Sequence, residues 1–177
     1  MEKAIVLTKN IAIRKTAIFS LLIGIAILVP AFLHSQAATG PIVNAVLFLA
    51  TALFAPEIAI LVGLLPSLVA LSSGLLPAPL APMVPFIMIS NTVLILSFYY
   101  LKKKNFWLGI VGASVLKFLF LFGTSTLVIN LLLKKELAKQ VSLMMNWPQF
   151  LTALAGGVIA YLFLRAIKKI KKVHDND

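Results

Sequence analysis

The chain has 177 residues, of which 61% are hydrophobic and only 12% are charged, and its mean hydropathy is +1.05. This composition leaves too little polar surface to cover a soluble globule, so it excludes an ordinary soluble domain and indicates a polytopic membrane protein. The absence of cysteine excludes disulfides, thiolate metal sites and thiol catalysis. The net charge of +11 comes from clusters at the ends of apolar runs, which argues against a nucleic-acid-binding protein.

The apolar residues gather into six runs of the kind that cross a membrane. A helix needs about 20 residues to span the hydrocarbon core of a bilayer. We therefore predict an all-α, polytopic membrane protein that forms a single membrane domain over residues 1–177. Its six transmembrane helices are expected at about residues 11–33, 41–55, 57–73, 85–101, 106–133 and 148–166.

Several of these runs contain residues that interrupt helices. The first run is long for the hydrophobic core of a signal peptide, so we expect a retained span and not a cleaved leader. The pair Gly40-Pro41 is expected to open the second span, and Pro66 is expected to kink the third. The connection over residues 74–85 contains four prolines, so we expect no helix there.

The lysines and arginines predict the direction in which the chain crosses the membrane. Of the 16 basic residues, twelve lie before or at the start of the first predicted span, between the fourth and the fifth, or at or after the end of the sixth. These twelve are Lys3, Lys9, Arg14, Lys15, Lys102, Lys103, Lys104, Arg165, Lys168, Lys169, Lys171 and Lys172. Because basic residues favour the cytoplasmic side, we predict that both termini are cytoplasmic. Irregular backbone at the opposite face is then the place for a binding site.

Small residues recur at every fourth position of the first predicted span. Ala12, Thr16, Ser20 and Gly24 share one face of a helix, and such a face lets another helix approach closely. Two interpretations stay open. The face packs against the chain's own helices, or it docks a partner subunit.

A single charged residue, Lys117, falls inside the fifth predicted span. It lies eleven residues after Phe106, about 17 Å along a helix axis and therefore near the middle of the membrane. A charge at that depth costs at least about 2.5 to 3.5 kcal/mol, and no acidic residue lies at a matching depth. Either the lysine meets an anionic ligand, or it snorkels or is capped by carbonyls that Pro66 frees.

Other polar residues gather in the predicted outer half of the membrane. Asn and Gln are the more informative of them, because Ser and Thr readily bond to their own helix backbone. Asn44 fits a structural bond between helices equally well, and Trp147 also fits an aromatic residue of the membrane interface. The outer candidates for ligand contact are His34, Gln36, Thr39, Asn91, Thr124, Ser125, Asn130, Asn146, Trp147, Gln149 and Thr152.

The chain lacks the sequence signatures of common enzymes. It has no Gly-x-Ser-x-Gly elbow, no phosphate-binding Gly-x4-Gly-Lys-Ser/Thr loop and no His-Glu-x-x-His motif. Its five carboxylates include none paired within a predicted span. We therefore predict no catalytic residue, no metal site, no cofactor and no ATPase activity of its own.

Taken together, the chain resembles the substrate-binding S component of an energy-coupling factor (ECF) transporter, a branch of the ATP-binding cassette systems. The resemblance rests on the size, the six spans, the small-residue face and two strings. These strings are Pro82-Met-Val-Pro-Phe-Ile-Met-Ile-Ser-Asn91 and Trp147-Pro-Gln-Phe-Leu-Thr-Ala-Leu-Ala-Gly-Gly157. Members of the family often carry Ala-x-x-x-Ala on the first helix for docking; here Ala12, Thr16, Ser20 and Gly24 are a looser substitute.

The resemblance implies a non-enzymatic subunit in the plasma membrane of a prokaryote. It would capture a small organic nutrient, such as a vitamin or its precursor, and work with a transmembrane coupling subunit and two cytoplasmic ATPases. The family site would fall on His34, Gln36, Asn91, Lys117, Asn130 and Trp147. Lys117 would meet an anion, the amides would orient the ligand, and Trp147 would stack on it. A structural or assembly subunit and a small secondary transporter remain the alternatives.

Overall fold

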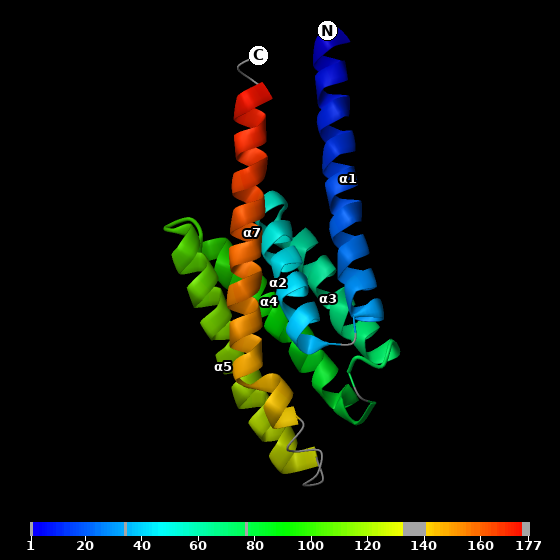
Figure 1. Cartoon of the computed structure of the whole chain (residues 1–177), viewed down its shortest axis with the longest axis vertical. Coiled ribbons are helices and arrows are strands. Elements are labelled where there is room, and N and C mark those ends of the chain that lie inside the picture. The colour runs from blue at the N-terminus through cyan, green and yellow to red at the C-terminus, as the bar shows by residue number, and fades with distance from the viewer. Residues whose placement is uncertain (1, 34, 77, 133–140, 175–177) are drawn as a thin grey trace.

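The computed structural model describes the backbone of residues 2–33, 35–76, 78–132 and 141–174, and the side chains of residues 12–33, 35–76, 81–129 and 141–167. Figure 1 shows helices that run along one common axis, and the described part contains no strand. The helices are α1 (Glu2–Phe32), α2 (Gln36–Leu53), α3 (Pro56–Ser72), the 3₁₀ helix η1 (Ala78–Met83), α4 (Val84–Leu101), α5 (Phe106–Leu132) and α7 (Trp147–His174).

The length and apolar composition of the helices identify the chain as a membrane protein. Within the described residues, five stretches are long and apolar enough to cross a membrane. They are Ala12–Phe32, Gln36–Leu53, Ala81–Leu101, Phe106–Ile129 and Val141–Ile167. Helix α3 is also apolar, but its 17 residues lie at the lower limit for a span. The prediction of an all-α, polytopic membrane protein is confirmed.

Two predicted breaks in the helices are wrong. Helix α2 begins at Gln36 and continues through Pro41, because packing on its neighbours outweighs the local preference of the Gly40-Pro41 pair. The proline-rich connection also forms a helix, η1, which leads directly into α4. The fixed φ of proline fits a 3₁₀ helix, and Pro85 in the first turn of α4 needs no hydrogen-bonded N–H.

The end of α3 turns on a glycine. Gly74 has a φ of +79°, the left-handed conformation that other residues adopt only with strain. The N–H of Leu76 then donates to the carbonyl oxygen of Ala70 at 2.8 Å, which satisfies an end carbonyl of the helix. This turn brings Leu75 and Leu76 back against the bundle instead of letting α3 continue.

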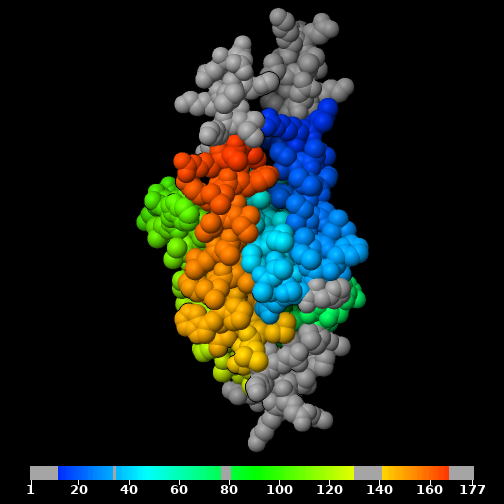
Figure 2. Space-filling model, in the orientation of Figure 1, coloured from blue at the N-terminus to red at the C-terminus, as the bar shows by residue number. Residues whose placement is uncertain are grey.

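Helix α2 lies at the centre of the bundle. It contacts α1, α3, α4 and α7, and its residues 43–51 are all buried. Figure 2 shows α2 as a narrow strip between α1 and α7 on the visible face. Helix α7 approaches α2 closely at Gly156, where a Cβ atom would lie 2.7 Å from the backbone of Pro41 and of Ala45. A glycine is therefore needed at this crossing.

The remaining helices enclose this centre and expose apolar side chains outward. Phe98 of α4 packs edge-on against Phe48 of α2 and Phe106 of α5, with ring centroids 4.8 and 5.2 Å apart. Large apolar residues such as Leu61, Leu127 and Leu162 are exposed on the outer surface. An exposed apolar surface of this kind suits contact with lipid.

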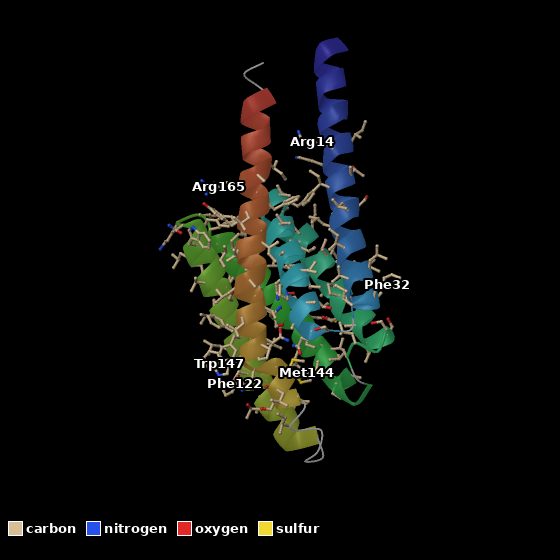
Figure 3. The ribbon with its side chains drawn as sticks, viewed as in Figure 1. Arg14, Phe32, Phe122, Met144, Trp147 and Arg165 are labelled. Atoms are coloured by element: carbon tan, nitrogen blue, oxygen red, sulfur yellow. The ribbon has the colours of Figure 1, made fainter. Side chains whose placement is uncertain are left out.

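Apart from Lys117, the basic side chains of the described part gather at one end of the bundle. Helix α1 begins and α7 ends at this end (Figure 1), and Figure 3 shows Arg14 and Arg165 there, far from Met144 and Trp147. The turn from α4 to α5, which carries Lys102 to Lys104, leads from the end of one helix to the start of the next. The start of α1 and the end of α7 therefore lie at the same end of the bundle, and the cytoplasmic position of that end stays a prediction.

Cysteine labelling tests which side of the membrane this end occupies. The natural chain has no cysteine, so a single introduced cysteine reports only on its own position. Lys103→Cys and Ser35→Cys replace exposed residues near the two ends of the bundle. If the basic end is cytoplasmic, a membrane-impermeant thiol reagent should label position 35 in intact cells and leave position 103 unlabelled until the cells are opened. The opposite labelling pattern would reverse the orientation.

Candidate functional site

A cavity of about 110 Å³ lies between the helices, toward the end opposite the basic clusters. Its walls come from the end of α1, the start of α2, α3, α4, α5, the helical residues 141–145 and the start of α7. The polar residues of the lining are Gln36, Thr39, Asn44, Ser67, Asn91, Lys117 and Gln149. The apolar residues include Pro30, Val43, Pro66, Ala70, Leu75, Leu76, Ile87, Met144 and Met145.

Lys117 forms the inner wall of this cavity. The residue is 3% exposed, and its Nζ donates to Oδ1 of Asn44 and to Oδ1 of Asn91, both at 2.8 Å. An ammonium group has three N–H donors and needs all of them satisfied when it is buried. Among the described residues, these two amides use only two of the three donors.

The two amides are themselves held in one orientation. Nδ2 of Asn44 donates to the carbonyl oxygen of Gly40 at 2.9 Å, and Nδ2 of Asn91 donates to that of Gly63 at 2.8 Å. Each amide thus places its nitrogen on the backbone and its oxygen on the lysine. The ammonium is held by three helices, α2, α4 and α5, in a position that depends on how these helices pack.

Two glutamines of the lining bond to the same backbone carbonyl. Nε2 of Gln36 and Nε2 of Gln149 both donate to the carbonyl oxygen of Met144, at 2.9 and 3.2 Å. Oγ1 of Thr39 donates to the carbonyl oxygen of Leu33 at 2.8 Å. The starts of α2 and α7 are therefore tied together through the segment 141–145.

Ser67 is a lining residue that the sequence did not single out. Its Oγ is buried and has no hydrogen-bond partner among the described residues. A buried hydroxyl normally has a partner, so an unpaired one in a cavity wall is available to a ligand. The sequence feature that could have indicated Ser67 is its position directly after Pro66, in the middle of an apolar helix. Ser114 is also buried and unpaired, but it does not line the cavity.

The predicted site residues have different outcomes. Gln36, Asn91 and Lys117 come together at the cavity. Trp147 is not part of the lining: the residue is 62% exposed, and its ring stacks on Phe118, with ring centroids 5.2 Å apart. His34 lies outside the described residues, as does the side chain of Asn130.

Lys117 is compensated by amide oxygens rather than by backbone carbonyls near Pro66. Asn44, for which the sequence left open a structural bond between helices, makes that bond to the lysine itself. The amides lower the cost of the buried charge, so neither snorkelling nor a backbone cap near Pro66 accounts for it. An anionic ligand at Lys117, which also lines the cavity, stays a prediction.

The face of small residues on α1 points away from the bundle. Ala12, Thr16 and Ser20 are exposed, and a Cβ atom at Gly24 would meet nothing within 4 Å. Helix α1 instead packs on its neighbours with buried residues such as Leu22 and Ala26. The described residues therefore do not support the interpretation that this face packs against the chain's own helices.

Fold and site together define a membrane protein whose helices surround a small cavity with both polar and apolar walls. The small-residue face of α1 is exposed on the outside of this bundle. The chain belongs to the family described as "ECF transporter, substrate-specific component", whose model matches residues 14–172. No curated protein and no solved structure matched the chain significantly. The family assignment makes it a substrate-binding membrane subunit of a transporter.

Proposed function

We propose that the chain binds a small organic anion in the Lys117 cavity and delivers it for ATP-driven uptake. The observation that carries this proposal is the position of Lys117, which lines the cavity and whose buried ammonium is oriented by two amides. The family assignment supports substrate binding as such. The anionic character of the substrate is inferred from the charge of the site.

The charge balance of the cavity favours an anion. Asn44 and Asn91 offer neutral oxygens, so they lower the cost of the ammonium without neutralising it. No Asp or Glu is present among the described lining residues. A ligand carboxylate would supply both the missing hydrogen bond and the missing negative charge, and such charge-assisted bonds are stronger than neutral ones.

The rest of the cavity favours a ligand with an apolar body. Prolines, methionines and aliphatic residues form most of the wall around the lysine. Methionine adapts its shape to irregular ligands, and Met144 and Met145 both line the cavity. A compact carboxylic acid with an apolar portion, such as a vitamin or its precursor, satisfies both parts of the lining.

Uptake against a gradient needs an energy source that this chain is not expected to contain, because its sequence has no phosphate-binding loop. We propose that it works in the plasma membrane of a prokaryote with a transmembrane coupling subunit and a pair of cytoplasmic ATPases. The exposed face formed by Ala12, Thr16, Ser20 and Gly24 supports this partnership, since small residues permit close helix packing within a membrane.

Ligand identification tests the proposed function directly. The full chain, purified from its native cells in mild detergent, should retain a small organic acid that mass spectrometry detects after the protein is denatured. The same compound should then bind to protein from which it has been removed. Retention of no ligand, together with no binding to a panel of vitamins and their precursors, would favour a structural subunit.

Ser67→Ala tests whether the ligand occupies this cavity. The hydroxyl has no partner in the described structure, so its removal should leave the stability of the empty protein unchanged. If the hydroxyl bonds to the ligand, affinity should fall by roughly twofold to tenfold, as expected for a hydrogen bond of about 0.5 to 1.5 kcal/mol. Calorimetric titration with the identified ligand measures the change.

Ser114→Ala provides the matched control for this measurement. It removes an equally buried and unpaired hydroxyl that lies outside the lining, so ligand affinity should not change. Equal affinities of both variants and the natural protein would remove Ser67 from the site.

A further inference from the structure

A second cavity, of about 770 Å³, lies at the basic end of the bundle, where the α4–α5 turn meets α7. It shares no lining residue with the Lys117 cavity. Figure 3 shows Arg165 on the side of α7 nearest this turn. The lining residues are Ala52, Leu53, Lys102, Lys103, Phe106, Tyr161, Leu164 and Arg165.

Three cations surround this cavity without an acidic neighbour in the lining. Lys102, Lys103 and Arg165 line it, and none of the described lining residues is Asp or Glu. Burial lowers the pKa of Lys102, and the adjacent charge of Lys103 lowers it further. The like charges therefore repel one another, and an anion placed among them would relieve that repulsion.

Both lysines contact other groups of the protein, although Lys103 is also exposed. Nζ of Lys102 donates to the carbonyl oxygen of Thr51 in the last turn of α2, and it lies 5.4 Å from the ring centroid of Tyr99. Nζ of Lys103 lies 4.8 Å from the same centroid. The end of a helix and the face of an aromatic ring both attract a cation, so these contacts fix where the positive charge is presented.

The other half of the cavity is apolar and lies at the boundary of the membrane. The span that carries α4 ends at Leu101, directly before Lys102, and α5 begins at Phe106. Ala52, Leu53, Phe106 and Leu164 form the apolar wall. Tyr161 adds an aromatic side chain of the type that favours the interface between lipid and water.

We propose that this cavity binds the phosphate head group of an anionic phospholipid from the adjacent leaflet. The cations recognise the phosphate, and the apolar wall accommodates the glycerol and the first carbons of the acyl chains. A free phosphate ion would use only the charged half. The membrane itself supplies the lipid, and the site does not depend on the substrate of the Lys117 cavity.

Lipid titration of the full-length protein tests this proposal. Delipidated protein in detergent should bind phosphatidylglycerol more tightly than phosphatidylcholine, as followed by native mass spectrometry and by thermal stability. The double variant Lys103→Gln/Arg165→Gln removes two exposed charges and should fold normally. Its affinity for phosphatidylglycerol should fall by roughly fivefold for each charge removed.

Lys104→Gln is the matched control, because Lys104 is exposed on the same turn and does not line the cavity. It should keep the affinity of the natural protein. Equal binding of the two lipids, or an unchanged affinity in the double variant, would overturn the proposal. Equal stabilisation by inorganic phosphate would identify a site for free anions. Loss of co-purification with a coupling subunit, with lipid binding intact, would identify a protein-docking surface.

Discussion

Replacing Lys117 by methionine should lower the affinity for an anionic ligand by about tenfold to a thousandfold, which corresponds to about 1.4 to 4 kcal/mol. Methionine keeps most of the apolar stem of the lysine and removes its charge and its hydrogen bonds. The ligand carboxylate would then be buried next to two amide oxygens that also lack a donor. Calorimetric titration of both proteins with the identified ligand measures the loss.

The stability of the empty protein separates a binding role from a structural one. The substitution removes a buried charge, but it also leaves Oδ1 of Asn44 and Oδ1 of Asn91 without their donor, so these effects oppose each other. We expect only a small change in the melting temperature. Unchanged affinity with a clearly less stable empty protein would make Lys117 a structural residue and would remove the reason to expect an anion. A neutral amide analogue of the ligand should bind the two proteins alike.

Replacing Gly24 by leucine should abolish co-purification with the coupling subunit and leave ligand binding intact. A side chain at this position meets open space in the described structure, so the variant should fold. A partner helix that approaches the small-residue face would instead collide with the leucine. The cavity lies away from this position, because its first lining residue on α1, Pro30, is six residues further along, about 9 Å on the helix axis.

Gly123→Leu is the matched control for the docking prediction. Gly123 lies on α5, and a Cβ atom there also meets nothing within 4 Å. This variant places an equal side chain on another lipid-facing helix and should leave co-purification unchanged. If Gly24→Leu and Ser20→Leu both retain the partner, the face on α1 is not its docking surface.

The helices could be predicted because the lipid environment imposes a simple rule on the sequence. Every span needs a long apolar run, and the run at residues 106–133 agrees closely with α5 (Phe106–Leu132). The starts of α2 and η1 could not be predicted in this way. Proline limits the local backbone, but packing decides whether a helix continues through it.

The site could be predicted only in part. The depth of Lys117 follows from its position in the run, since each residue adds a fixed rise along the helix. The hydrogen-bond partners of Lys117 could not be predicted in this way. Asn44 and Asn91 are 73 and 26 residues away in the sequence, and their contact with Lys117 depends on how three helices rotate about their axes. The same rotation places the ring of Trp147 on Phe118 instead of in the cavity.

Gly156 affects the proposed binding site because it lacks a side chain, although it does not line the cavity. A Cβ atom there would lie 2.6 Å from Cβ of Asn44, the residue whose amide oxygen orients Lys117. Any larger residue at position 156 must displace that amide. Natural selection for a particular substrate, and any effort to redesign the specificity of the protein, therefore act on a position that contributes no contact of its own.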